Sequence, residues 1–109
     1  MSLTIRDGGT ITKDPADIRV YTVDWNVLGA LAPDVAIVTS TWTITAITPA
    51  GDTALTKDQA TILDDDRRTQ LRLTGGTLGA RYRIDNTIVT DEVPAQTIER
   101  SFYVRIATQ

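Results

Sequence analysis

Cysteine and histidine are both absent from this sequence of 109 residues. Without cysteine, the chain has no disulfide framework, no thiolate nucleophile and no thiolate metal site. Without histidine, it lacks the usual general base near neutral pH and the most common imidazole metal ligand. These absences exclude serine–histidine and cysteine–histidine catalysis. We therefore expect a structural or binding protein with no enzyme activity, no cofactor and no bound metal.

Positive charge is also scarce, with 11 basic against 14 acidic residues and a formal net charge of −3. Electrostatic binding to nucleic acid needs a basic excess, which the chain as a whole does not have. No apolar run approaches the ~20 residues of a membrane-spanning helix. The first 11 residues also lack the apolar centre of a secretory signal. We expect neither nucleic acid nor a membrane among the partners.

Threonine, isoleucine and valine are abundant, with 19, 11 and 8 copies. These β-branched side chains favour strands over helices, and no long segment shows a helical period of apolar residues. Turn signals separate short alternating segments, which is typical of an antiparallel sandwich. The predicted strands are 3–6, 10–13, 18–27, 35–47, 53–56, 60–63, 69–74, 81–90 and 97–107.

One corner of the chain favours an immunoglobulin-like (Ig-like) sandwich. A glycine-rich turn at 75–79 is followed by Tyr82 at the start of the next predicted strand. In Ig-like domains a tyrosine near this corner bonds through its hydroxyl to nearby backbone, and Trp42 suits the core aromatic of an early strand. We predict an all-β, Ig-like antiparallel β-sandwich of seven to nine short strands, with a jelly roll or small barrel as alternatives. Residues 13–109 would form this domain, and residues 1–12 an N-terminal arm or first strand.

Three groups of residues allow a chemical interpretation beside a structural one. The run Asp64–Asp66 offers oxygen ligands to Ca²⁺, but it lacks the spacing of a calcium loop, so a solvated turn is favoured. The glycines at 75–79 lack the lysine and the following helix of a phosphate-binding loop. A carboxylate pair of the glycosidase type would need a substrate cleft that so short a chain does not easily form. The candidate carboxylates are Asp85, Asp91, Glu92 and Glu99.

Two tryptophans, Trp25 and Trp42, are the residues best suited to stack on a sugar or a base. Both lie in predicted strands among alternating apolar residues. Alternation of this kind places a side chain on the buried face of a sheet. We therefore expect both indole rings in the core.

Arginine and tyrosine gather on the predicted solvent side of the last two strands. Alternation places Arg81 and Arg83 on that side of one strand, and Tyr103 and Arg105 on that side of the next. These residue types are enriched among the anchors of protein interfaces. We predict a protein–protein interface formed by Arg81, Arg83, Tyr103 and Arg105, with a solubilising face held by ion pairs as the alternative.

Several blocks of the sequence are similar, in the same order, to one known group of proteins. The blocks are Lys13–Ile18 with Tyr21–Trp25, Ser40–Ile44, Gly75–Asn86 and Glu99–Arg105. Together they resemble the small Ig-like structural proteins found in the virions of tailed bacteriophages, which are loosely described as phage fibre proteins. The chain departs from the pattern in the longer connection at 91–97 before the last block.

The resemblance implies a non-enzymatic part of the virion, assembled in the host cytoplasm. It implies a capsid decoration protein, or a component of the head–tail junction or tail. The partners would be capsid, portal, neck or tail subunits, and a homo-oligomer is a further option. The alternative function is an adhesion module, displayed on the particle, that recognises carbohydrate or another part of the host surface.

Overall fold

The structure is a computed structural model that describes residues 3–5, 8–25, 31, 33–63 and 66–108. In these residues all regular secondary structure is β, which confirms the predicted fold class. The strands are β1 (Leu3–Ile5), β2 (Thr10–Lys13), β3 (Ile18–Asp24), β4 (Ile37–Thr48), β5 (Leu55–Ile62), β6 (Arg68–Gly75), β7 (Arg81–Thr90) and β8 (Thr97–Ile106).

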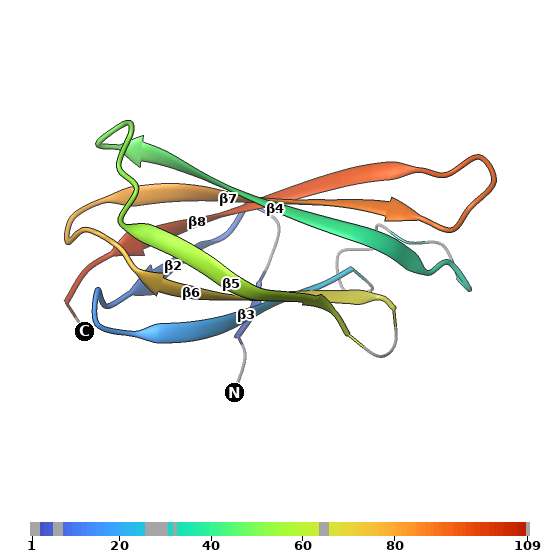
Figure 1. Cartoon of the computed structure of the whole chain (residues 1–109), viewed down its shortest axis with the longest axis horizontal. Helices are drawn as coiled ribbons and strands as arrows, with labels where there is room; N and C mark the ends of the chain where they lie inside the picture. The colour runs from blue at the N-terminus through green and yellow to red at the C-terminus, as the bar shows by residue number, and fades with distance from the viewer. Residues whose placement is uncertain (1–2, 6–7, 26–30, 32, 64–65, 109) are drawn as a thin grey trace.

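The strands form two sheets of four, in the orders β1-β3-β6-β5 and β2-β8-β7-β4. The two sheets face each other along the 43 Å length of the molecule (Figure 1). This is the ABED and CFG arrangement of Ig-like domains, with β2 added beside the last strand. Pairing is antiparallel except for β1 with β3 and β2 with β8. The structure therefore confirms an Ig-like sandwich of two separate sheets.

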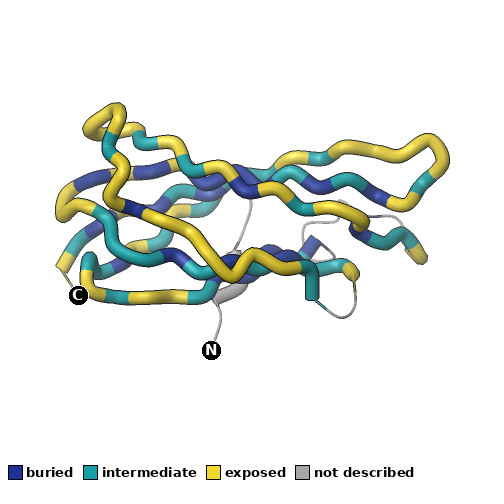
Figure 2. Tube along the Cα trace, in the orientation of Figure 1, coloured by how far each residue is buried: buried dark blue, intermediate teal, exposed yellow. Residues whose placement is uncertain are grey.

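The core lies between the sheets, where alternate residues of the facing strands are buried (Figure 2). On β7 and β8 the inward side chains are almost fully buried, among them Tyr82 and Phe102. Trp42 on β4 meets the Phe102 ring edge-on, with ring centroids 6.5 Å apart. Trp42 is 5% exposed and Trp25 is 0% exposed, which confirms the prediction that both rings lie in the core.

A bulge accounts for one wrong prediction. The sequence predicts two strands, at 53–56 and 60–63, but the structure has the single strand β5 over Leu55–Ile62. Between Asp58 and Thr61 this strand has one residue more than β6 opposite it, and Gln59 has a φ of 55°. An extra residue of this kind interrupts alternation without ending the strand, so the sequence pattern falsely indicates a break.

A second bulge corrects the inward face of β4. Alternation predicts Val38 on the same side as Trp42, but Val38 is 56% exposed and Ile37 is buried instead. The pairing shifts by one residue between Ile37 and Thr39, which turns Val38 out of the core. The predicted strand 18–27 is shorter in the structure, where β3 ends at Asp24, and residues 26–30 lie outside the described part.

A buried series of hydrogen bonds links the two sheets. The Trp25 indole N–H donates to the Thr69 hydroxyl (3.1 Å), which donates to the Asn86 side-chain oxygen (2.5 Å). The Asn86 amide nitrogen donates in turn to the Ser40 hydroxyl (2.8 Å) and to the Thr41 carbonyl (3.1 Å). Thr69 and Asn86 are both 0% exposed. A buried polar group without a partner costs free energy, so these hydrogen bonds favour one relative position of the sheets.

Tyr82 fixes one end of the sandwich, as the sequence predicts. Its hydroxyl accepts a hydrogen bond from the Thr77 backbone N–H (3.2 Å) and donates one to the Asp52 carboxylate (2.6 Å). Asp52 also accepts hydrogen bonds from the Thr77 hydroxyl (2.7 Å) and the Ala54 backbone N–H (2.8 Å). These bonds, with that from Tyr82 first, lower the pKa of Asp52. The sequence did not point to Asp52, which lies 30 residues from its tyrosine partner.

Lys13 ties the same end together from inside the core. The residue is 1% exposed, and its ammonium donates to the carbonyls of Gly75 (2.7 Å) and Asp14 (3.0 Å). Burial lowers its pKa, and the nearby Asp17 and Asp14 oppose that shift.

A Cβ on Gly76, where φ is 104°, would lie 2.6 Å from the Ile106 side chain. This close approach supports a structural role for the glycine-rich turn.

Candidate functional site

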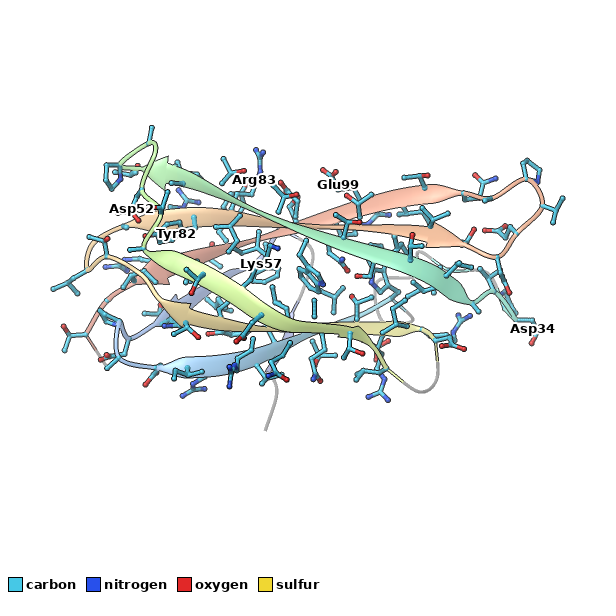
Figure 3. All side chains as sticks on the ribbon, viewed as in Figure 1. Asp34, Asp52, Lys57, Tyr82, Arg83 and Glu99 are labelled. Carbon is cyan, nitrogen blue, oxygen red and sulfur yellow. The ribbon has the colours of Figure 1, made fainter. Side chains whose placement is uncertain are left out.

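The outward face of the β2-β8-β7-β4 sheet brings together the four predicted interface residues. Arg81 lies directly opposite Arg105, and Arg83 lies directly opposite Tyr103. Directly paired residues of neighbouring strands share one face of a sheet. The structure therefore places all four side chains on one surface, where Figure 3 shows Arg83 pointing away from the other sheet. Whether this surface is an interface stays a prediction.

The four residues differ in their contacts. The Arg81 guanidinium lies over the Tyr103 ring, 4.8 Å from its centroid. The Arg83 Nε lies 3.2 Å from Asp85 Oδ1, and Asp85 also accepts a short hydrogen bond from the Ser101 hydroxyl. Asp85 is only 8% exposed although it lies on the outward face. Arg83 therefore has a local countercharge, whereas the partner of Arg81 is an aromatic ring.

Threonines flank these residues on both neighbouring strands. On β4, Thr45 and Thr48 lie opposite Arg83 and Arg81, respectively. On β2, Thr10 and Thr12 lie opposite Tyr103 and Arg105, and all four threonines are exposed. The arginines of this surface therefore have short, exposed polar side chains as neighbours on both adjoining strands.

Negative charge lies farther along the same face. Glu99 is the register partner of Thr87, and its carboxylate accepts a hydrogen bond from the Thr87 hydroxyl (3.1 Å). Both Arg83 and Glu99 lie on the outer side of this sheet in Figure 3. The face is therefore basic toward the end of β8 and acidic toward its beginning.

The β7–β8 connection is the most exposed apolar feature at the acidic end. Val93 at this turn is 99% exposed, and the Asp91 carboxylate accepts a hydrogen bond from the Ala36 backbone N–H (3.0 Å). This bond joins the connection to the residues that precede β4. At the opposite end, Leu78 is 61% exposed in the turn before β7. The two ends of the sandwich thus present different surfaces.

A groove of about 350 Å³ lies between the edge strands β4 and β5. It lies beside the bulges of both strands, and its lining mixes aliphatic and hydroxyl side chains. The lining residues are Val38, Thr39, Ser40, Ala60, Thr61 and Ile62.

The described residues do not form the metal site or the aromatic stacking platform that the sequence allowed. Asp64 and Asp65 lie outside the described residues, and within those residues no group of three or more acidic side chains could hold a metal ion. Both tryptophans are buried, so neither offers a stacking platform. In the described part of the chain, no helix is long and apolar enough to cross a membrane.

The four candidate carboxylates each contact a different local partner. The contacts of Asp85, Asp91 and Glu99 are described above. Glu92 accepts a hydrogen bond from the Thr90 hydroxyl (3.1 Å). The contacts satisfy turns and strand neighbours, and they show no acid–base pair facing a common cleft.

The fold is a small Ig-like β-sandwich with polar residues on an outer face and exposed loops at its ends. Residues 13–105 match the family described as Podophage GP4 fiber-tail adaptor protein gp77, and the chain belongs to this family. It is therefore a tail-associated structural protein of the phage virion, whose partners are other virion proteins. Among curated proteins, no significant match to the chain is found.

Proposed function

We propose that this protein is a non-enzymatic adaptor that joins the phage tail to its fibres. The observation that carries the proposal is the family match over residues 13–105, a range that includes strands of both sheets. The family description names a fibre–tail adaptor, so one tail subunit and one fibre subunit are the partners we assign.

The shape of the molecule suits a bridge between two partners. An adaptor must hold both at once, on surfaces that do not overlap. The sandwich is 43 Å long, with a basic, aromatic surface near the end of β8 and an exposed loop at residues 91–96 at the other end of that strand. These separated surfaces give each partner its own contact area.

The other virion positions expected from the sequence have less support. A capsid decoration protein or a head–tail junction component would also be an Ig-like structural protein, but the family description names a fibre–tail adaptor. An adhesion module would need an exposed aromatic platform, and Trp25 and Trp42 are both buried. We therefore keep the tail–fibre boundary as the proposed position.

Co-sedimentation with separated virion parts tests this proposal. The full chain is mixed with purified tails, with isolated fibres and with capsid shells, and bound protein is quantified for each. We expect saturable binding to tails and to fibres, and attachment of fibres to tails only when the protein is present. Binding to shells alone, at a stoichiometry matching the capsid lattice, would overturn the adaptor proposal and indicate a decoration protein.

A further inference from the structure

We propose that Arg81, Tyr103 and Arg105 form a docking site for a short acidic segment of one protein partner. The inference rests on the proposed function, since it gives the chemistry of one of the two contacts that the adaptor makes. We refer to the three residues as the Arg81–Tyr103–Arg105 cluster.

Uncompensated charge is the first argument. Arg81 and Arg105 are direct register partners. Opposed residues on one face of an antiparallel pair have Cβ atoms about 4.5–5.5 Å apart, and like charges there are destabilising. Within the described residues neither guanidinium forms an ion pair with a carboxylate. A partner carboxylate would relieve a repulsion that the folded chain does not relieve itself.

Tyr103 prepares Arg81 for this contact. The ring lies 4.8 Å from the guanidinium, within the range of a cation–π interaction. A guanidinium that lies over an aromatic ring still has N–H groups with which to bind a carboxylate. The ring contact also restrains a flexible side chain before binding, which reduces the entropy lost when the complex forms.

Arg83 is not part of the cluster, although it lies on the same face. Its guanidinium is already paired with Asp85, whose carboxylate also accepts a hydrogen bond from Ser101. A ligand carboxylate at Arg83 would have to compete with this nearly buried partner. Arg83 therefore lines the site, and the uncompensated positive charge stays on Arg81 and Arg105.

The position of Glu99 limits the size of the ligand. Glu99 lies six residues before Arg105 on β8, which is about 20 Å at a strand rise of about 3.3 Å per residue. A long polyanion lying along this face would meet the negative charge of Glu99. A short acidic protein segment fits the space between the arginines and Glu99, and the net charge of −3 argues against a nucleic acid.

Charge reversal at the cluster tests the inference with the full chain and purified tails and fibres. The test variant carries Arg81→Glu and Arg105→Glu. The control carries Arg19→Glu and Lys57→Glu, which make the same change in charge at exposed positions on the other sheet. Because Arg19 forms an ion pair with Asp17 (3.7 Å), circular dichroism also checks that the control folds. We expect the test variant to lose about tenfold or more in affinity for one of the two partners. The control should bind both partners as the wild type does.

A milder variant and a salt series keep the result clear. Arg81→Gln with Arg105→Gln removes the charge without adding repulsion, and it replaces the reversal variant if circular dichroism shows that the latter does not fold. We expect it to bind the affected partner more weakly than the wild type. Its affinity should also fall less steeply as salt concentration rises, because fewer charge contacts remain to be screened.

The outcomes separate the two proposals. Wild-type protein that binds tails and fibres, with unchanged binding by the reversal variant, would overturn the docking site but leave the adaptor function standing. Equal losses in the test and control variants would also overturn the site, because net charge would then explain the effect. Wild-type protein that binds neither tails nor fibres would overturn the adaptor function itself. Loss of binding to duplex DNA alone, with tail and fibre binding intact, would replace the acidic protein segment by a nucleic acid.

Discussion

The two faces of the β7–β8 pair carry opposite kinds of residues within the same ten-residue strands. The inward face holds Tyr82, Ile84 and Phe102, each at most 1% exposed. The outward face holds Arg81 and Arg105, which are both exposed and lie directly opposite each other. Because successive side chains of a strand point to opposite sides, substitutions one position apart should separate stability from binding.

The two faces differ in what they contribute to the free energy of folding. Inside, apolar burial and satisfied hydrogen bonds stabilise the sandwich. Outside, an arginine pair without a carboxylate partner in the described residues contributes repulsion to folding. The inward face is organised for folding, and the outward face is better explained by a partner.

Truncating the inward aromatic should give the largest loss of stability. Phe102→Ala removes a 1% exposed ring that contacts Tyr21 and Trp42, and we expect a loss of about 3–5 kcal/mol in the free energy of unfolding. Urea denaturation measures it. Tyr103→Ala, at the next position but on the outward face, is the control and should cost about 1 kcal/mol or less. Equal losses at the two positions would show that the outward face stabilises the fold as much as the inward face does.

Removing the buried amide should have the next largest effect. Asn86→Leu keeps the branched shape and the number of side-chain heavy atoms but removes the acceptor of the Thr69 hydroxyl and the donor to Ser40 and Thr41. We expect a loss of about 1–3 kcal/mol, measured by the same denaturation. Thr87→Val, on the outward side of the same strand, should change stability by only about 0.5 kcal/mol. An unchanged free energy of unfolding for Asn86→Leu would show that the buried hydrogen bonds do not help to hold the sheets together.

Removing the Tyr82 hydroxyl should cost less. Tyr82→Phe keeps the buried ring and deletes the hydrogen bonds to Thr77 and Asp52. We expect a loss of about 0.5–1.5 kcal/mol in the free energy of unfolding. An unchanged midpoint in thermal unfolding would mean that this corner is held by packing alone.

The pH dependence of stability should show the contribution of the charged Asp52 carboxylate. Its pKa in the folded protein lies below the ordinary value of 3.8, first because of the hydrogen bond from Tyr82. The stabilisation from the charged form is therefore fully present above pH 3.8 and is lost as the pH falls through the lowered pKa. In denaturation series at decreasing pH, we expect the stability difference between wild type and Asp52→Asn to shrink. A difference that stays constant down to the lowest pH would contradict this assignment.

The smallest effect on stability is expected at the outward arginines. Arg105→Ala and Arg81→Ala should each change the free energy of unfolding by no more than about 0.5 kcal/mol. The change at Arg105 should be neutral or stabilising, because it relieves the repulsion across the strand pair. Destabilisation by about 2 kcal/mol at either site would show that the arginines serve the fold, and would weaken the case for a partner.

Regular alternation made much of the fold predictable from the sequence. Tyr82 and Trp42 marked the Ig-like core because their strands alternate cleanly and the corner has a recognisable turn. The bulge in β4 made the predicted side of Val38 wrong, and the bulge in β5 made one strand look like two. In each case one inserted residue reverses the alternation after it. Contacts between distant segments left no local signal, as for Asp52 with Tyr82 and Lys13 with Gly75.

The outward site was predictable in part for the same reason. Alternation placed Arg81, Arg83, Tyr103 and Arg105 on one side, and the structure brings them together. Alternation also places Asp85, two residues after Arg83 on β7, on this side, so the sequence carried a signal for the Arg83–Asp85 pair. It did not show the contacts made from β8, by Ser101 with Asp85 and by Tyr103 with Arg81. Side-chain partners across strands require the register, which the sequence pattern did not define.

Hydroxyl-radical footprinting of the tyrosines, with the protein free and bound to tails or fibres, is the most direct test of whether the Arg81–Tyr103–Arg105 cluster contacts a partner. Tyr21 and Tyr82 are at most 1% exposed, whereas Tyr103 is partly exposed on the outward face. Oxidation of Tyr103 can therefore report on this surface, with the other two tyrosines as internal controls. We expect strong protection of Tyr103 in one of the two complexes. Unchanged oxidation of Tyr103 in both complexes would contradict this expectation.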